Sequence, residues 1–528
     1  MQQVSFISNH NSFLKTLLLI LLFSFGFSAA QADPNTSDST ITVAAGKHYL
    51  RSGFHRFWWG SHYRKVWAEP VEAPYFFLDQ FEGGVRPLEQ GGSFQTKNLR
   101  LVDKNGREYV LRSIDKDPSG ALPKKLQKTF VANLMRDQTS VIHPYGAFIV
   151  PALATAAGVY HTNPRLVYIA DDAALGEFQK EFANTLALLE ERPDGNWETI
   201  SSFGNPKEIV SSRKAFDNLV KSTDHQVDSK RYLRSRLFDM WLSDWSRRED
   251  QWRWSVTKEG DVTRYGPIPR DRDHAFFKFN DGLLTKLVSV FKPNYQSFDK
   301  TIVGQNVKGL IKSSFQMDAY LLAYLTKEDF QKVALDLQNR LSDEVIKKAL
   351  QKWPPQIREL SEKEFAAKLK SRRGDLLSAA EVFYSQLNKE VLLPGSDAKD
   401  TFEFLFQEDG SLQVHHWIDK EEKKVLLHQK TYLSHETKSI SVFGLGEKDT
   451  FVLKGKGRSK MQLTLYGGEG TDKLVTDSSF KPSGKKVLIS NEEDGNNYPK
   501  HPKVEIKKHT PAAQEFNGEG WLLRHRLH

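Results

Sequence analysis

The sequence predicts an α+β protein composed of a strand-rich lobe, a helical lobe and a small all-β domain. Residues 99–103 and 108–114 read as strands on either side of Asn105-Gly106, a pair that favours a β-hairpin turn. Apolar residues at positions 233, 237, 240 and 241 then recur at helical spacing. Beyond residue 392, short strand patterns alternate with turn residues. These three patterns set the predicted order of the parts.

The predicted boundaries follow the changes in pattern. We expect a strand-rich lobe over residues 33–170, a helical lobe over 171–394, a β-domain over 395–490 and a polar tail over 491–528. The first lobe also holds a predicted helix over 147–157, interrupted by Pro151 and closed by Gly158, and a strand over 165–170. In the second lobe a helix begins at Ser342, Pro354-Pro355 breaks the pattern, and residues 360–387 resume it.

Composition narrows the class of protein. Among 528 residues, 39% are hydrophobic and 12% aromatic, which is typical of a globular chain. Cysteine is absent, so disulfides, thiolate catalysis, cysteine-linked lipid anchors and cysteine-based zinc sites are excluded. The net charge of +9 is modest, and acids and bases are interleaved. This favours a solvated mixed-charge surface over a nucleic-acid partner.

The first 32 residues have the pattern of a signal peptide. Lys15 precedes an apolar run over 17–27, and Ala30 and Ala32 have the spacing of an A-x-A cleavage site. Cleavage is expected before Asp33. The run is too short to span a bilayer comfortably, and no transmembrane span is predicted in the mature chain. We therefore expect export to the periplasm or outer cell envelope of a Gram-negative bacterium.

The predicted β-domain contains two related turns. Its expected strands cover residues 401–406, 412–418, 425–429, 439–443, 451–453 and 461–466, with a hairpin turn at Asp409-Gly410. Residues 467–474, GGEGTDKL, match a nonapeptide Ca²⁺ repeat, and residues 444–451 are a degenerate copy. The copies are 23 residues apart (467 minus 444), whereas Ca²⁺ rolls need tandem nine-residue repeats. We expect equivalent Gly–Asp turns and no Ca²⁺ site.

Two segments of the helical lobe could carry phosphoryl chemistry. A helix pattern ends near residue 242 and leads into a loop rich in charge and tryptophan. About twenty residues later a predicted strand presents Asp271 and Asp273 at i and i+2, on one face. Phosphoryl transfer needs a carboxylate that orients the hydroxyl and oxygen ligands that hold Mg²⁺. The alternative is ordinary surface ion pairs with locally packed tryptophans.

The strand-rich lobe offers phosphate-binding groups. Gly91 and Gly92 precede the strand at residue 99, and a glycine turn lets backbone N–H groups approach phosphates. Arg112 and Lys116 follow on the returning strand, within possible reach of those phosphates. The alternative is a plain turn beside an edge strand flanked by two cations.

In this order, the motifs resemble the atypical protein-kinase-like folds of the CotH and HipA kinases. More closely, residues 91–116, 137–145 and 236–276 resemble a kinase-like module of exported Bacteroidetes-type proteins. The resemblance spans about residues 45–390 and implies a two-lobed protein-kinase-like fold. It also implies Mg²⁺ (or Mn²⁺) and ATP or another nucleotide as cofactors. Gln251, Asp271 and Asp273 would bind metal; Gly91, Gly92, Arg112 and Lys116 would bind nucleotide.

The sequence departs from that family at the catalytic loop. Aligned on Trp252 and Trp254, Ser246 stands where the family has its catalytic Asp, and Arg248 where it has His. Asp244, with Arg247 beside Ser246, is the candidate replacement. Without a replacement the chain is a nucleotide-binding pseudokinase.

A second class of function fits several of the same features. The missing Asp, the β-rich C-terminal part and the scarcity of extracytoplasmic ATP favour a non-catalytic interaction or assembly module of the envelope. Its partner would be an envelope protein or a glycan. Aromatic residues at 54, 57, 58, 59, 63 and 67 could form a carbohydrate or membrane-surface platform. We expect instead an amphipathic helix packed against the lobe, and we expect His415-His416 to serve packing.

Overall fold

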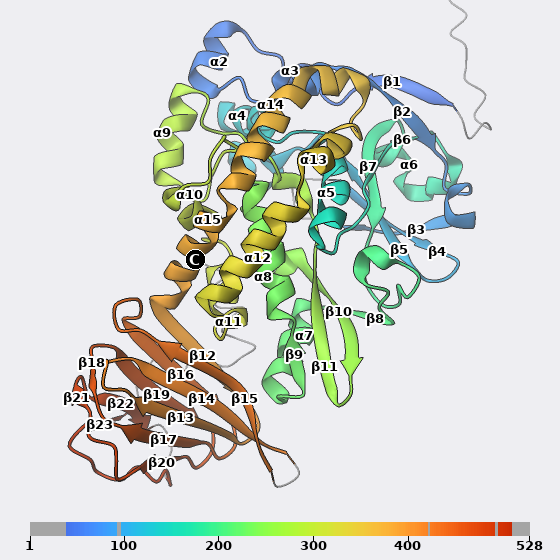
Figure 1. Ribbon diagram of the computed structural model, residues 1–528. Helices are drawn as coiled ribbons and strands as arrows, with labels where there is room; N and C mark the ends of the chain where they lie inside the picture. The colour runs from blue at the N-terminus through green and yellow to red at the C-terminus, as the bar shows by residue number, and fades with distance from the viewer. Residues whose placement is uncertain (1–38, 92–96, 421–422, 492–494, 509–528) are drawn as a thin grey trace, which may run out of the picture.

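The computed structural model describes residues 39–91, 97–420, 423–491 and 495–508. It has a sheet-rich N-terminal part beside a helical middle part, and a strand-rich C-terminal domain that lies below the helical part in Figure 1. Residues 1–38, which include the predicted signal peptide, and Gly92 lie outside the described residues.

A seven-stranded sheet forms the centre of the N-terminal part, in the order β1-β2-β6-β7-β5-β4-β3. Its strands are β1 (Thr40–Ala44), β2 (Pro70–Phe76), β3 (Val85–Gly91), β4 (Asn98–Asp103), β5 (Glu108–Ser113), β6 (Arg165–Ile169) and β7 (Thr185–Glu191). β4 and β5 pair antiparallel, which confirms the predicted hairpin, and Gly106 takes a φ of 80° in its turn. The sheet runs to Glu191, past the predicted boundary at residue 170, because β7 pairs between β5 and β6.

Helices fill the middle of the molecule, mostly to one side of this sheet (Figure 1). They are α2 (Gly53–Trp59), α3 (Arg64–Ala68), α4 (Phe130–Asp137), α5 (Val150–Ala157), α6 (Gln179–Phe182), α7 (Ser212–Lys221), α8 (Ser229–Trp241), α9 (Leu283–Phe291), α10 (Gly304–Leu310), α11 (Phe315–Leu321), α12 (Lys327–Arg340), α13 (Asp343–Leu350), α14 (Pro355–Gly374) and α15 (Leu376–Asn388). Pro151 and Pro355 stand in the first turns of α5 and α14, where a missing N–H costs nothing. Pro354-Pro355 therefore begins a helix.

The helical part also contains a four-stranded sheet that the sequence analysis missed. Its strands are β8 (Glu208–Ser211), β9 (His225–Val227), β10 (Trp252–Glu259) and β11 (Val262–Pro269), in the order β8-β10-β11-β9. Apolar residues of α8, including Leu233 and Leu237, share one core with Trp252 and Trp254 of β10. This core holds the end of α8 against the start of β10, so the loop between them has fixed ends.

The C-terminal domain is a short β-solenoid. Parallel strands stack in two sheets, β12 (Glu390–Ser396), β16 (Ser439–Leu445), β19 (Gln462–Gly468), β22 (Val487–Asn491) and β23 (Val504–Lys508) in one, and β13 (Asp400–Phe406), β17 (Thr450–Gly455) and β20 (Lys473–Thr476) in the other. The hairpin β14 (Leu412–Lys420) and β15 (Lys423–Tyr432) extends the second sheet, and β18 (Arg458–Ser459) pairs with β21 (Ser483–Gly484). The domain extends beyond both predicted limits, 395 and 490, because β12 and β23 join the same stack.

The Gly–Asp turns occupy equivalent positions in successive coils. Residues 443 and 466 are paired, as are 445 and 468, so Gly444 lies beside Gly467. A Cβ at Gly444 would lie 2.0 Å from Asp449 Oδ2, and one at Gly467 would lie 1.8 Å from Asp472 Oδ2. Glycine is required because the buried aspartate of each turn lies against its backbone. His416 packs on Phe402 and contacts Asp400 Oδ1 at 2.7 Å.

One helical stretch among the described residues, Phe130–Ala157, is long and apolar enough to cross a membrane, and 61% of its apolar window is buried. It includes α4 and α5, which lie in the N-terminal part. Length and composition alone are weak evidence for a membrane span, and core helices of this kind pass the same test.

Candidate functional site

A cleft of about 740 Å³ lies between the seven-stranded sheet and the loops around β10 and β11. This volume is within the range of ordinary ligand pockets, roughly 300–1,000 Å³. Its polar wall is formed by Gly91, Asn98, Arg100, Arg112, Lys116, Glu190, Glu191, Arg192, Ser246, Arg248, Asp250, Gln251, Arg270, Asp271, Asp273 and His274. Its apolar wall includes Trp59, Leu134, Met135, Val141, Ile142, Trp245, Phe277, Phe279, Val288 and Tyr295. Arg112 and Lys116 form ion pairs with Asp271 and Asp273, and we call this region the charged end. Helices α2, α4 and α9, which contact one another, contribute Trp59, Leu134 and Val288, and we call this region the apolar end.

Asp271 and Asp273 line the cleft, but they do not lie on a strand. β11 ends at Pro269, and Asp271 takes a φ of 55°, a left-handed conformation that aspartate tolerates better than most residues. The 3₁₀ turn Arg272–His274 follows. The strand predicted over Asp271 and Asp273 is therefore wrong, because β11 ends before the first carboxylate.

Two cations, one on the sheet and one just beyond the end of β5, meet these carboxylates. Arg112, on β5, donates to Asp271 Oδ1 at 2.6 Å and lies 3.1 Å from Glu190 on β7. Lys116 forms an ion pair with Asp273. The sheet and the segment after β11 are therefore joined by salt bridges across the charged end of the cleft.

Burial and neighbouring charge shift the pKa values of Asp271 and Asp273 in opposite directions. Burial raises the pKa of Asp273, and the adjacent Asp271 carboxylate raises it further. Burial also opposes ionisation of Asp271, but Arg112 and Lys116 outweigh it and hold its pKa well below the usual range. Although burial disfavours a charged Arg112, Asp271 and Glu190 raise its pKa. Asp271 is thus ionised at neutral pH, whereas additional positive charge nearby would stabilise the ionised form of Asp273.

Ser246 and Gln251 belong to the loop that enters the cleft from α8. The backbone carbonyl of Gln251 accepts a 2.9 Å hydrogen bond from the N–H of Arg270, which extends the β10–β11 ladder by one step. Gln251 therefore lies opposite Arg270, the residue that precedes Asp271. Ser246 is 9% exposed and lines the same cleft. The structure brings Ser246, Gln251, Asp271 and Asp273 together, with Gly91, Arg112 and Lys116 opposite them.

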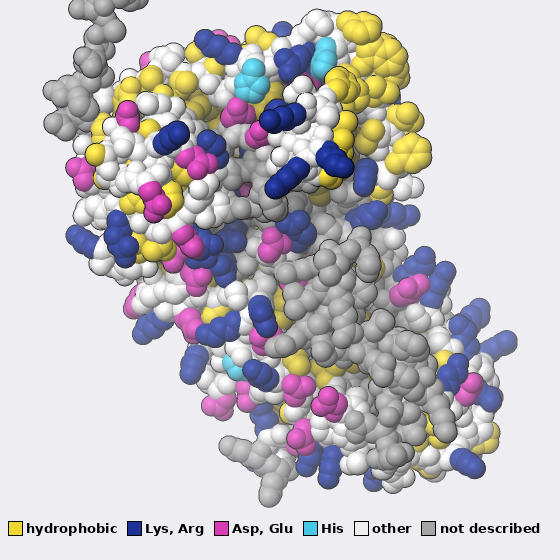
Figure 2. Space-filling model, turned by 180° about the vertical axis from the view of Figure 1, so that it is seen from behind, with side chains coloured by type: hydrophobic (Ala, Val, Ile, Leu, Met, Phe, Trp, Pro, Cys, Tyr) yellow, Lys and Arg dark blue, Asp and Glu magenta, His cyan; other side chains and the backbone are white. Residues whose placement is uncertain are grey.

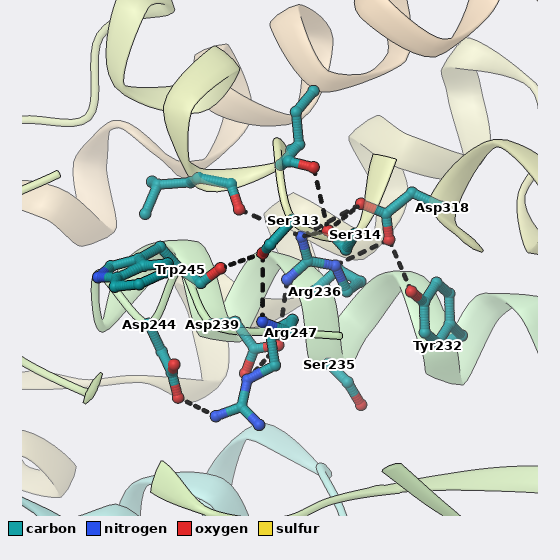
Figure 3. Close-up of polar contacts among 12 residues, drawn as sticks. Tyr232, Ser235, Arg236, Asp239, Asp244, Trp245, Arg247, Ser313, Ser314 and Asp318 are labelled. Atoms are coloured by element: carbon teal, nitrogen blue, oxygen red, sulfur yellow. Dashed lines mark hydrogen bonds and ion pairs between the residues drawn. The ribbon is translucent and has the colours of Figure 1, made fainter. Parts of the chain in front are cut away.

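Asp244 and Arg247 do not line the cleft. Their side chains are fully buried and form an ion pair with each other (Figure 3). Arg247 also donates to the carbonyl of Arg270 at 2.6 Å. Burial lowers the pKa of Arg247 to about 9, and Asp239 acts in the opposite direction, so the guanidinium stays charged at neutral pH. The prediction that Asp244 replaces the missing carboxylate is wrong in placement, because its carboxyl group points into the protein.

A buried ion network lies beside this loop (Figure 3). Arg236 of α8 donates to Asp318 at 2.8 Å and to Ser314 Oγ at 2.6 Å, and Tyr232 donates to Asp318 at 2.6 Å. Ser313 Oγ donates to the carbonyl of Trp245. The start of α11 therefore fixes both α8 and the first residues of the loop.

Several polar cleft residues were not predicted from sequence. Burial lowers the pKa of Arg270 to about 10 and that of His274 to about 4, so the imidazole is neutral in the cleft. Both amide atoms of Gln138, at the end of α4, are buried without a hydrogen-bond partner among the described residues. Arg270 and His274 flank the Asp-x-Asp motif, which could have indicated them. Gln138 is distant in sequence, and no motif marks it.

The donor set permits only a small metal site. Among the described residues, no group of three or more His, Asp or Glu side chains is placed to hold a metal ion. Asp271, Asp273 and Gln251 provide two carboxylates and one amide. Mg²⁺ is commonly held by one or two carboxylates together with substrate phosphates and water, so these donors are compatible with it.

In comparisons with known proteins, no family model and no curated protein matches the chain. Among similar solved structures is the proinflammatory kinase CtkA of Helicobacter pylori, 11% identical, covering 57% of this chain and 95% of its own, with a TM-score of 0.31. Another is HipA of Shewanella oneidensis MR-1, from a complex with HipB and operator DNA, 14% identical, covering 57% and 72%, with a TM-score of 0.26. These scores are too low to support a function, which we argue from the cleft.

Proposed function

We propose that the cleft binds a nucleotide together with Mg²⁺ or Mn²⁺, in a protein-kinase-like protein that transfers phosphate slowly or not at all. One observation carries the proposal: Arg112 of β5 and Lys116, just after β5, face two carboxylates of the segment after β11 in one cleft. Nucleotide phosphates need cations, and their metal needs carboxylates. The apolar wall offers a surface for the base.

The charged end supplies the parts for a metal-bound phosphate. Arg112 and Lys116 would exchange their carboxylate partners for phosphate oxygens, and Gly91 would present backbone beside them. Asp271, Asp273 and Gln251 would hold the metal, which would neutralise phosphate charge when bound. Since burial and Asp271 raise the pKa of Asp273, a divalent cation would favour its ionised form.

The same geometry argues against efficient phosphoryl transfer. A kinase base orients the acceptor hydroxyl, and that position holds Ser246, a neutral side chain. Asp244 is buried in its ion pair with Arg247. Asp250 lines the cleft but is half exposed and engages Arg248 at 3.1 Å. We therefore propose binding without a placed carboxylate base.

The rival proposal is a non-catalytic interaction or assembly module whose partner is an envelope protein or a glycan. The stacked solenoid coils favour it, since such domains present extended surfaces to partners. For either function we propose export to the periplasm or outer envelope, on the strength of the first 32 residues of the sequence.

Isothermal titration calorimetry of the purified protein with ATP and GTP, each with Mg²⁺ or Mn²⁺, tests the proposal. Wild-type protein should bind at least one of these nucleotide–metal pairs. Asp273→Ala should weaken binding on the order of tenfold or more, since it removes one of two charged metal ligands. Asp261→Ala, in the exposed β10–β11 turn, is the matched control and should bind as wild type does.

Two outcomes would decide against this proposal. If no nucleotide binds with either metal while the protein is folded, the assembly-module proposal remains. If nucleotide binds equally well to Asp273→Ala and to wild type, the ligand lies elsewhere on the molecule.

A further inference from the structure

Helices α2, α4 and α9 expose large apolar side chains on one face of the molecule. Phe54 and Phe57 of α2 are 77% and 61% exposed, Phe130 of α4 is 70% exposed, and Val290 and Phe291 of α9 are 73% and 75% exposed. In the same segments Leu126, Val131, Leu283, Leu287 and Val288 are also exposed. We call these ten residues the apolar face. Figure 2 shows hydrophobic side chains gathered in this region.

The three helices are held together, so the apolar face is one surface. α2 packs against α9, and a Cβ at Gly282, just before α9, would lie 2.2 Å from the backbone N of Gly60, just after α2. His55 of α2 contacts Asp137 Oδ2 at the end of α4 at 2.9 Å. This arrangement corrects the expectation for the aromatic cluster: Tyr63 and Trp67 pack inside, whereas Phe54 and Phe57 point to solvent.

The charge of these segments is of one sign. Residues 50–68, 118–136 and 282–298 contain no Asp or Glu. They carry six exposed lysines: Lys65, Lys124, Lys125, Lys128, Lys286 and Lys292. Within the part of the chain that the structure describes, none of these lysines lies within ion-pair distance of a carboxylate. Basic residues thus rim an apolar surface that has no acidic side chain of its own.

We infer that the apolar face docks on the surface of a bilayer that contains anionic phospholipid. Phe, Leu and Val side chains would enter the interface while the lysines contact phosphate head groups, the combination typical of interfacial helices. A protein partner fits less well, because lysine is depleted in protein–protein interfaces. Apolar patches of this kind on a folded protein mark interaction sites.

The position of the apolar face relates it to the cleft. Val288 belongs to the apolar face and also lines the cleft. Trp59 of α2 and Leu134 of α4, from the other two helices, line the cleft as well. A docked molecule would therefore hold the apolar end of the cleft beside the lipid head groups. This inference does not depend on nucleotide binding, since it rests on the three helices alone.

Vesicle flotation of the full chain without nucleotide tests the inference, with phosphatidylcholine vesicles that contain or lack phosphatidylglycerol. The protein should float with the anionic vesicles, and less at high salt, which screens the lysines. The triple change Phe54→Ser, Phe57→Ser, Phe291→Ser and the triple change Lys124→Glu, Lys125→Glu, Lys128→Glu should each lower the bound fraction on the order of tenfold or more.

Matched controls come from exposed residues of other helices. The double changes Leu335→Ser, Leu360→Ser and Lys332→Glu, Lys347→Glu should leave flotation unchanged, and melting curves should show all variants folded. Failure of the wild type to float with anionic vesicles would overturn the inference. So would a lipid-free dimer, seen by analytical ultracentrifugation and lost in the phenylalanine variant, because a second copy would then cover the apolar face.

Discussion

At the residue scale, the buried aspartates of the solenoid form a ladder along its axis. Asp449 Oδ1 accepts from the N–H of Asp400 at 2.8 Å, and Asp472 Oδ1 accepts from the N–H of Asp449 at 3.0 Å. In the next coil Asn496 accepts from the N–H of Asp472 at 2.6 Å. Burial, with Asp400 and Asp472 nearby, raises the pKa of Asp449 to about 9. The protein thus keeps Asp449 protonated at neutral pH.

This ladder predicts how stability depends on pH. A carboxyl group with a raised folded-state pKa stabilises fully below its unfolded pKa, near 3.8, and loses that contribution as pH rises to about 9. The Asp449→Asn variant, which copies Asn496, should remove this loss and be the more stable protein at alkaline pH. In urea unfolding across this range, the free energy of unfolding of the variant should fall less steeply with pH than that of the wild type, by at most about 1.4 kcal/mol per pH unit. An unchanged slope would show that Asp449 is ionised.

Ser246 carries the second prediction at this scale. The Ser246→Asp substitution places a carboxylate on the cleft wall, where a kinase base orients the hydroxyl. Any phosphoryl transfer, measured as release or transfer of the γ-phosphate, should rise on the order of tenfold or more, because general-base catalysis typically contributes 10²–10⁴-fold. Ser246→Asn, which is nearly isosteric and neutral, is the control and should not raise it. Equal rates in both variants would contradict the role given to this position.

At the element scale, buried contacts of α8 with α11 and α14 determine how the loop between α8 and β10 leaves the helix. Arg236 and Asp318 are both fully buried, and the pair joins α8 to α11. Arg372 of α14 donates to the carbonyls of Met240 and Trp241 at 2.6 and 2.7 Å, at the C-terminal end of α8. A cation at the C-terminal end of a helix also interacts favourably with the helix dipole. Together these contacts fix the direction in which the loop leaves the helix.

The Asp318→Ala variant tests the network. It removes the acceptor of Arg236 and Tyr232 and leaves a buried guanidinium without its main counter-charge. The free energy of unfolding should fall by about 3–5 kcal/mol in denaturant titrations. Glu208→Ala breaks an exposed pair with Lys214 and should cost no more than about 1 kcal/mol. A loss as small as that of the control would mean that the buried network is not stabilising.

Elements that depend on local residues could be predicted, and elements that depend on distant partners could not. The 99–114 hairpin follows from Asn105-Gly106, and the Gly–Asp turns follow from repeated spacing. The burial of Asp244 depends on its ion pair with Arg247 and on Arg272, a residue of a later segment whose Nη1 lies 3.6 Å from Asp244 Oδ2. A third turn with the same spacing, Gly395 and Asp400, was missed because Ser396 and Ala398 stand where the 467–474 turn has Gly468 and Gly470.

At the scale of the whole molecule, the solenoid is joined to the helical part by its first sheet and its hairpin. Ala323, after α11, belongs to the solenoid core, and Lys430 of β15 donates to its carbonyl at 3.0 Å. α11 also contributes Asp318 to the network under the cleft. The solenoid therefore contacts the end of α11, the helix that also supports the loop between α8 and β10. The cleft itself lies between the sheet and the β10–β11 segment.

Hydrogen–deuterium exchange of the wild-type protein, with and without Mg²⁺-ATP, tests the central claim most directly. A nucleotide in the cleft should slow exchange in residues 98–113 and 245–274, on both walls, and leave the solenoid coils of residues 462–476 unchanged. Slower exchange confined to the solenoid, or no change at nucleotide concentrations that saturate binding, would contradict the assignment of the cleft as the nucleotide site.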